Sequence, residues 1–240
     1  MSDILSMKPA KPLLEVRNLV TEFPVRNGVF RAVNDLSFSI DRGKTLCVVG
    51  ESGSGKSVTA RSILQIIDSP GSIASGSIIL NRADGTSLDL AKLDPRSRAI
   101  RSVRGADIAM IFQEPMSSLS PVHTVGDQIT EVLRLHLKMS KAQARAEAIE
   151  LLRQVEIPNP EKALDRYAFQ YSGGMRQRAM IAMALACKPQ LLIADEPTTA
   201  LDVTTQAEIL DLISRLQKAH GMAVLFITHD MGVVAEIADR

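Results

Sequence analysis

The sequence predicts an α/β fold in which a mostly parallel β-sheet is covered by helices on both faces. Four short runs rich in Val, Ile and Leu, at 45–49, 108–112, 191–194 and 223–227, alternate with stretches whose apolar residues recur at helical spacing. Continuous apolar runs of this length are typical of strands buried on both faces of a sheet. Because such a sheet needs a helical layer on each side, and because 45% of the 240 residues are hydrophobic, we expect one domain with a substantial core.

Two helices are marked by their first residues. Ser140 is followed three residues later by Gln143, and Thr205 by Glu208, which is the spacing of a capping box. Apolar residues then recur at helical spacing in both segments, and a proline or a glycine follows each of them. We therefore expect helices that begin at these two capping residues.

The rest of the chain divides around the predicted core. Residues 12–42 alternate loosely between apolar and polar types and contain turn residues, which predicts a small antiparallel β flank. Residues 115–171 contain the first capped helix within a long polar stretch, which predicts a helical insertion subdomain. Residues 43–114 and 172–240 then form the core of a single domain over 1–240.

The charge balance gives no support to nucleic-acid binding. The chain has 28 Lys and Arg against 27 Asp and Glu, so no broad basic field would attract a phosphate backbone. The first residues lack the apolar stretch of a secretory signal, and no apolar run is long enough to cross a bilayer. We expect a protein that is cytosolic or bound peripherally to a membrane.

A phosphate-binding motif follows the first buried strand. Residues 50–57, GESGSGKS, fit the P-loop pattern, and a segment of helical period comes next. Glycines let successive backbone N–H groups point into one concavity, and the helix N-terminus adds about half a positive charge. Lys56 would hold the β- and γ-phosphates, and the Ser57 hydroxyl would ligate Mg²⁺. The expected ATP-binding residues are Gly50, Glu51, Ser52, Gly53, Ser54, Gly55, Lys56, Ser57 and Val58.

Two acids close the apolar run at 191–194. Asp195 and Glu196 would lie at the carboxyl edge of the sheet, where parallel sheets bind their ligands. In isolation, two acids after a strand more often cap a helix or face solvent. Beside a P-loop, they predict that Asp195 holds Mg²⁺ through its water shell and that Glu196 polarises the attacking water as general base. The predicted fold is therefore a P-loop NTPase (RecA-like) core with an antiparallel β subdomain and a helical insertion.

The segment YSGGMRQR at 171–178 resembles the signature motif that separates ABC (ATP-binding cassette) ATPases from other P-loop proteins. It precedes the two acids along the chain, as it does in that family. A serine and two glycines at a helix N-terminus form an anion site that lacks a lysine. The resemblance implies that this segment binds the γ-phosphate of ATP held on a partner subunit, through Ser172, Gly173, Gly174 and Met175.

Further residues match landmarks of the ABC family in the same order. Gln113 matches the Q-loop, Asp202 the D-loop and His229 the switch histidine, while Phe23 matches the aromatic residue that stacks on adenine. Each is weak alone, because a glutamine after a strand is usually a solvated loop residue and a phenylalanine is often core. The resemblance implies catalytic roles for Gln113 and His229, an additional Mg²⁺ contact for Gln113, and a dimer contact for Asp202.

Three stretches, at 111–119, 171–178 and 197–206, look like the dipeptide and oligopeptide importer branch of the family. The resemblance implies an ATPase subunit that uses ATP and Mg²⁺ to drive peptide uptake at the cytoplasmic face of the bacterial plasma membrane. Its implied partners are a second ABC ATPase subunit, identical or paralogous, transmembrane permease subunits and a solute-binding protein. Related members handle nickel or glutathione, so both solutes are alternatives to peptides.

Other classes fit less well. ABC ATPases of DNA repair carry a long coiled coil between Q-loop and signature, and too few residues separate Gln113 from Ser172 for one. Those of translation carry two cassettes in one chain, whereas one P-loop occurs here. A binding module without turnover is opposed by the full set of catalytic residues. The chain stops at Arg240, shortly after His229, where family members continue, so we expect a truncated C-terminal end.

Overall fold

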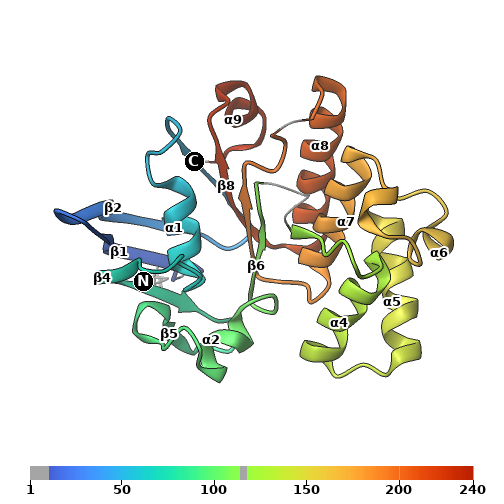
Figure 1. Cartoon of the computed structure of the whole chain (residues 1–240), viewed down its shortest axis with the longest axis horizontal. Coiled ribbons are helices and arrows are strands. Elements are labelled where there is room, and N and C mark those ends of the chain that lie inside the picture. Colours follow the sequence, from blue (N-terminus) through green and yellow to red (C-terminus); the bar gives the residue numbers. More distant parts are fainter. Residues whose placement is uncertain (1–10, 114–117, 200, 240) are drawn as a thin grey trace, which may run out of the picture.

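A parallel four-stranded sheet lies at the centre of the computed structural model, which describes residues 11–113, 118–199 and 201–239 (Figure 1). Its strands in spatial order are β3 (Thr45–Val49), β8 (Ala223–Thr228), β7 (Leu191–Asp195) and β6 (Ile108–Ile111). All three neighbouring pairs run parallel. These are the four apolar runs of the sequence with ends that differ by at most one residue, so the prediction of a parallel-sheet α/β fold is confirmed.

Alternate residues of β7 show that both faces of this sheet are buried. Leu192 and Ala194 belong to a core that the sheet shares with the helices on one side. Leu191 and Ile193 belong to a second core, shared with the antiparallel strands and the helix after the P-loop. Because successive side chains of a strand point to opposite faces, a continuous apolar run was the pattern to expect here.

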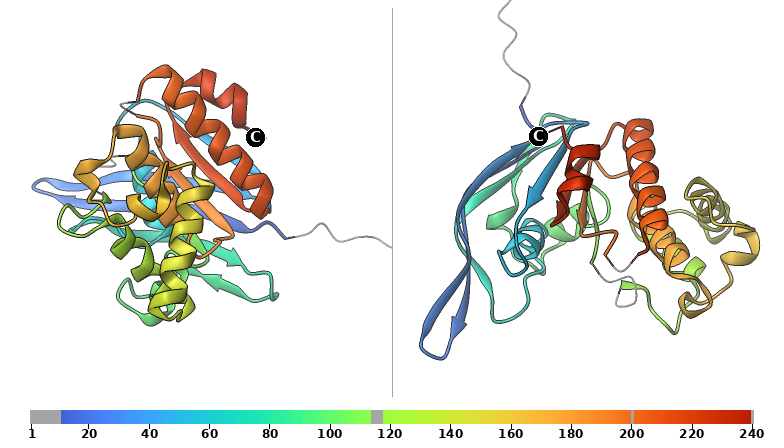
Figure 2. Two further views of the ribbon diagram at one scale, coloured as in Figure 1. Left: turned by 90° about the vertical axis from the view of Figure 1, so that its right-hand side faces the viewer. Right: turned by 90° about the horizontal axis from the view of Figure 1, so that it is seen from above.

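A second, antiparallel sheet packs on one side of this centre. Its spatial order is β2 (Gly28–Ile40), β1 (Leu14–Val25), β4 (Ser72–Asn81) and β5 (Ser87–Asp89). The β1–β2 hairpin is long, and its tip projects from the molecule (Figure 2). The sequence pattern predicts antiparallel strands only within 12–42. The pattern gave no sign of β4, because its buried apolar residues are confined to Ile78 and Leu80.

The helices lie on both sides of the parallel sheet, and most of them gather at the end of the molecule opposite the hairpin (Figures 1 and 2). In chain order they are α1 (Lys56–Ile63), the 3-10 turn η1 (Leu90–Lys92), α2 (Arg98–Val103), α4 (Val125–Leu137), α5 (Lys141–Gln154), α6 (Pro160–Ala163), the 3-10 turn η2 (Ala168–Gln170), α7 (Gly173–Leu185), α8 (Val203–His220) and α9 (Met231–Ile237). In the described part of the chain, no helix combines the length and apolar character that a membrane span requires.

One of the two predicted helix starts is confirmed. Ser140 and Gln143 form a complete capping box at the start of α5. The other prediction was wrong, because α8 begins earlier, with Asp202 as its N-cap. The backbone N–H of Thr205 donates to the Asp202 carboxylate at 3.0 Å, so Thr205 lies in the first turn of the helix and is not its cap. Asp202 accepts from the free amide of the first turn, and sequence spacing alone does not choose between Asp202 and Thr205 as the N-cap.

Candidate nucleotide-binding site

The P-loop connects β3 to α1 and closes on its own lysine. Lys56 Nζ donates hydrogen bonds to the carbonyl oxygens of Gly50 at 2.7 Å and Glu51 at 2.8 Å, and its side chain is largely buried. Gly55 is the N-cap of α1 with φ of +90°, a conformation that a residue with a Cβ rarely adopts. The ammonium group is thereby held inside the loop, close to the start of the helix, where a polyphosphate is best stabilised.

The β1–β2 hairpin contacts this loop at Ala32. The pairing of β1 with β2 shifts register between Thr21 and Glu22, and Ala32 lies between the paired residues Arg31 and Val33. A Cβ added to Gly55 would lie only 2.1 Å from the Ala32 carbonyl oxygen. Glycine at this position therefore serves the close approach of two backbones as well as the turn of the P-loop.

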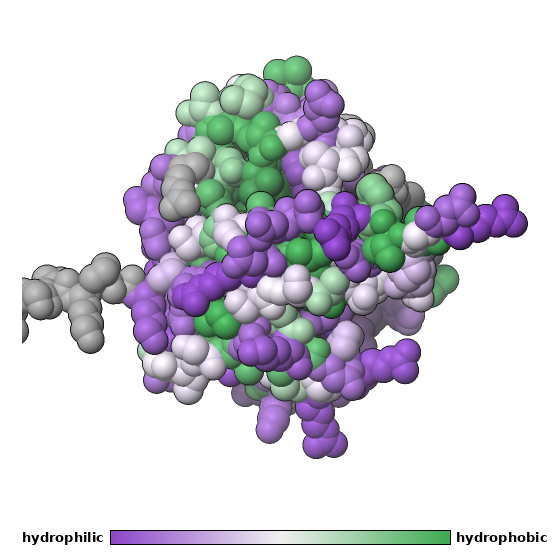
Figure 3. All heavy atoms as spheres, turned by 90° about the vertical axis from the view of Figure 1, so that its left-hand side faces the viewer, coloured by the Kyte–Doolittle hydropathy of each residue, from purple (hydrophilic) through white to green (hydrophobic). Residues whose placement is uncertain are grey.

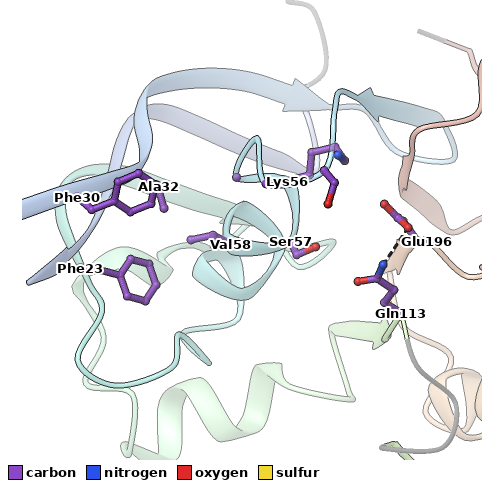
Figure 4. Close-up of a pocket in the computed structure, with 11 residues that line it drawn as sticks. Phe23, Phe30, Ala32, Lys56, Ser57, Val58, Gln113 and Glu196 are labelled. Atoms are coloured by element: carbon purple, nitrogen blue, oxygen red, sulfur yellow. Dashed lines mark hydrogen bonds between the residues drawn. The ribbon is translucent and has the colours of Figure 1, made fainter. Parts of the chain in front are cut away.

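A cavity of about 410 Å³ opens beside the P-loop (Figure 4). Its volume lies within the usual range for small-molecule sites, roughly 300–1,000 Å³. Its lining combines P-loop residues with side chains from the hairpin, from the end of β6 and from the end of β7, namely Phe23, Phe30, Ala32, Ser52, Gly53, Gly55, Lys56, Ser57, Val58, Gln113 and Glu196. The apolar side chains lie toward one end and the charged and amide groups toward the other (Figure 4).

The two acids at the end of β7 differ in environment. Asp195 is buried, and its carboxylate accepts a hydrogen bond from the Ser57 hydroxyl at 3.1 Å. Burial raises the pKa of Asp195, an effect that the Ser57 hydrogen bond opposes and the nearby Glu196 charge reinforces. A hydroxyl and a carboxylate at this distance form an all-oxygen donor pair, which is the chemistry that Mg²⁺ prefers.

Three side chains contact the carboxylate of Glu196 at the polar end of the cavity. Gln113 Nε2 and Thr199 Oγ1 each donate to Glu196 Oε2 at 3.0 Å, and His229 Nδ1 lies 3.3 Å from Oε1. The backbone of Glu196 has φ of +46°, an uncommon value outside glycine. Burial would raise the pKa of Glu196, but the hydrogen bonds with Thr199 and His229 and the positive charges nearby outweigh it and lower that pKa. The group is thus held as a carboxylate that can accept a proton.

The signature segment lies away from this cavity. Ser172 is the N-cap of α7, and its hydroxyl accepts from the Met175 backbone N–H at 3.2 Å. Ser172 and Gly173 are exposed at the surface, and none of the four signature residues lines the cavity. Gly174 packs toward α8, since a Cβ there would lie 2.9 Å from Thr205 Cγ2. One chain therefore presents the P-loop and the signature as two separate surfaces.

An ion-pair cluster fixes α7 against its neighbours. Arg178, whose side chain is 12% exposed, binds Glu156, just after the end of α5, and Glu208 on α8 at 2.9 and 3.0 Å. It also donates to the Val155 carbonyl oxygen at 3.0 Å, and Glu156 binds Arg215 of α8 at 2.6 Å. Several charges in one network hold geometry better than isolated surface pairs do. The cluster orients the signature helix relative to α8, which begins at the predicted D-loop residue Asp202.

The sequence did not reveal every residue of the cavity. Phe30 and Ala32 were not singled out, nor was Thr199, which donates to Glu196. Phe30 is only seven positions from the predicted aromatic residue Phe23 and pairs with it across the hairpin. The turn residues between the two phenylalanines could have indicated that a hairpin pairs Phe30 with Phe23. In the stretches compared with peptide importers, residues 114–117 and Ala200 lie outside the described residues.

Asp195→Asn is expected to stabilise the folded chain by about 0.5–2 kcal/mol at pH 7. Because the folded state raises the pKa of Asp195, this group favours folding below its unfolded pKa, and that contribution is lost as pH rises through the folded pKa. The amide removes this loss and can still accept from Ser57. Urea unfolding between pH 4 and 8 measures the effect, with the exposed Asp41→Asn as control. Equal shifts in the two variants would contradict the burial argument.

The chain is similar in sequence to a known protein family and to named ATP-binding proteins. A family model described as ABC transporter matches residues 33–199. A glutathione import ATP-binding protein, GsiA, from Pectobacterium atrosepticum is 57% identical over 98% of this chain and 37% of its own length. A putative peptide import ATP-binding protein from Brucella melitensis biotype 1 is 53% identical over 96% of this chain and 68% of its own length. The chain thus spans little more than a third of the GsiA relatives that it matches.

Solved structures of ATP-binding cassettes share the fold. The dimeric cassette MJ0796 in a post-hydrolysis state, bound to ADP and Pi, superposes with a TM-score of 0.79 at 26% identity, covering 92% of this chain and 89% of that one. CbiO1 from Clostridium perfringens, part of the ABC transporter complex cbiONQ, superposes with a TM-score of 0.74 at 26% identity, covering 96% and 83%. Each superposition covers more than nine-tenths of this chain.

Proposed function

The chain belongs to the ABC transporter family, and from this premise we propose that it binds and hydrolyses ATP to drive import of peptides or of glutathione. The observation that carries this proposal is the convergence of Lys56, Ser57, Gln113 and Glu196 on one cavity. These residues come from three separate parts of the chain and supply a cation, a hydroxyl, an amide and a carboxylate. Together they match the needs of phosphoryl transfer to water.

The donor set suits Mg²⁺ as well as nucleotide. Ser57 Oγ and the Asp195 carboxylate would hold the ion, with Gln113 within reach of the same end of the cavity. When bound, Mg²⁺ neutralises charge on the phosphate oxygens. Lys56 would exchange its carbonyl partners for phosphate oxygens, and the backbone amides of residues 50–55 would orient the phosphates.

Glu196 is proposed to accept the proton of the attacking water. Its lowered pKa keeps it ionised at neutral pH, and the amide of Gln113 and the ring of His229 fix the direction of its carboxylate. A base held within hydrogen-bond reach of the nucleophile is the first requirement of general base catalysis. His229 and Gln113 are therefore proposed as residues that orient Glu196 and contact the γ-phosphate.

Two chains are proposed to pair head to tail, because the signature lies apart from the cavity that contains the P-loop. In such a pair, Ser172 and the glycines after it would close the site formed by the partner's P-loop, with Asp202 at the contact. A relative in the fold comparison, MJ0796, is described as dimeric. The partner is a second copy or a paralogue.

A groove of about 280 Å³ supports a membrane permease as a further partner. Its lining is largely apolar and comes from the end of α1, β6, α4 and α7, with Ile66, Met110, Phe112, Val132 and Met183 among its residues. Phe112 is adjacent in sequence to Gln113, which binds Glu196. A permease segment bound in this groove could therefore bias the position of the catalytic carboxylate, with the chain at the cytoplasmic face of the plasma membrane.

The solute is proposed from the names of the relatives. The matched proteins are named for import of glutathione, itself a tripeptide, and of peptides. Both solutes share the peptide backbone, which makes a small peptide the best-supported class and leaves nickel a weaker alternative. A solute-binding protein outside the membrane completes the proposed assembly.

Mg²⁺-dependent ATP hydrolysis by the purified chain, measured over a range of protein concentrations, tests the proposal. Turnover should rise more than linearly with protein if paired chains are the active species. Lys56→Ala should weaken ATP binding by about 10- to 100-fold, because a charge-assisted contact contributes roughly 1.5–3 kcal/mol. Lys92→Ala, an exposed lysine away from the cavity, is the control. Equal ATP binding by all three proteins would refute the assignment of the site.

A further inference from the structure

We propose that the base of the nucleotide is held between two phenylalanine rings, Phe23 and Phe30, and that Phe30 is a residue that determines affinity for the base. This inference rests on the proposed function and deepens it. The resemblance to ABC ATPases implies one aromatic contact, at Phe23, whereas the cavity is lined by both rings. Figure 4 shows both at the apolar end of the cavity, with Val58 inward of them.

The hairpin brings the two rings to the same surface. Phe23 of β1 and Phe30 of β2 are directly paired across the antiparallel ladder. Residues opposite one another in such a ladder project their side chains to the same face. Two rings carried on one rigid pair of strands form a preorganised site for a flat aromatic ligand, because little freedom is lost when the ligand binds.

The two rings differ in how firmly they are held. Phe23 packs directly on Gly71, since a Cβ added there would lie 2.4 Å from Phe23 Cε1 and 2.7 Å from Ile67 Cγ2. Phe30 is 55% exposed and lies near the tip of the hairpin. The Phe23 ring is therefore held in place by its packing, whereas the exposed ring of Phe30 can be covered by a bound ligand. Figure 3 looks onto the end of the molecule from which the hairpin projects, where apolar surface is mixed with polar side chains.

The chemistry of the cavity identifies the ligand part that fits between the rings. The apolar end is formed by Phe23, Phe30, Ala32 and Val58, and the opposite end by the side chains proposed to bind phosphate and Mg²⁺. Among these four described residues no side chain offers a polar group to read the edge of a base. Recognition would therefore use the faces of the rings, and stacking of a base on an aromatic ring is tolerant of base identity.

Binding of ATP and of inorganic tripolyphosphate, compared by titration calorimetry, separates the base from the phosphates. Phe30→Ala should weaken ATP binding by about 5- to 100-fold, as expected for loss of one stacking partner, and leave tripolyphosphate binding unchanged. Phe30→Tyr, which keeps the ring, should bind ATP as the parent does. Val29→Ala, at an equally exposed neighbour that does not line the cavity, should have no effect.

A second readout uses the absence of tryptophan from the sequence. In Phe30→Trp the single indole should be quenched by ATP and not by tripolyphosphate. If Phe30→Ala binds ATP like the parent, or if the indole does not respond to ATP, the role of Phe30 is refuted while the ATPase proposal stands. If the parent chain binds tripolyphosphate as tightly as ATP, the base adds no affinity and the two-ring site is refuted. If it binds neither ligand, the proposed function itself fails.

Discussion

Glu196→Gln is expected to lower the rate of ATP hydrolysis by about 10²- to 10⁴-fold, the usual contribution of a positioned general base. The amide keeps the shape of the side chain and can still contact Gln113 and Thr199, but it cannot accept the proton of water. ATP binding should persist, and the variant should accumulate as an ATP-bound pair of chains. Single-turnover hydrolysis and size-exclusion chromatography with ATP measure the two effects.

The matched control is Glu131→Gln, which removes an exposed carboxylate from α4, away from the cavity. It should hydrolyse ATP at the parent rate. Rapid turnover by Glu196→Gln would rule out the base assignment, and slow turnover by both variants would point to a general effect of charge.

Gly55→Ala is expected to be the most damaging small substitution in the P-loop. The added Cβ would lie 2.1 Å from the Ala32 carbonyl oxygen, so either the loop or the hairpin must move, and φ of +90° is itself unfavourable for alanine. Backbone strain of this kind costs about 1–3 kcal/mol, and the overlap adds a comparable amount. Urea unfolding should show a loss of several kcal/mol, and ATP binding should become undetectable.

Gly53→Ala separates the two causes. Gly53 has φ of +81°, but a Cβ there meets nothing within 4 Å. It should therefore show the backbone strain without the overlap and lose only about 1–3 kcal/mol. If both substitutions lower the free energy of unfolding equally, the close contact between Ala32 and Gly55 does not contribute to the loss of stability.

Much of the fold follows from local sequence. The four parallel strands are continuous apolar runs because both of their faces are covered, and the α5 capping box is complete within four residues. The P-loop is similarly local, since the turn, the lysine and the helix start are adjacent along the chain. Such features depend on neighbours in sequence, so one sequence is enough to predict them.

Other parts depend on tertiary contacts that sequence spacing does not encode. β4 joins the antiparallel sheet by pairing with β1, and only two of its apolar residues are buried. Thr199 reaches the Glu196 carboxylate through the backbone turn at Glu196, and Phe30 reaches the cavity through the register of the hairpin. The local sequence pattern predicted that Glu196 lies beside the P-loop. Roles for Gln113 and His229 were predicted only from resemblance to a family, and their contacts with Glu196 are seen only in the structure.

The separation of the signature helix from the P-loop cavity bears on how defects would be inherited. If chains pair as proposed, a chain with a damaged Ser172 still offers a sound P-loop but impairs the site on its partner. In a cell that makes both forms of such a chain, random pairing would leave only a minority of pairs with two complete sites. If transport requires both sites of a pair, a signature lesion would act in a dominant manner, whereas a lesion that abolishes folding would remove the chain from the pool and be recessive.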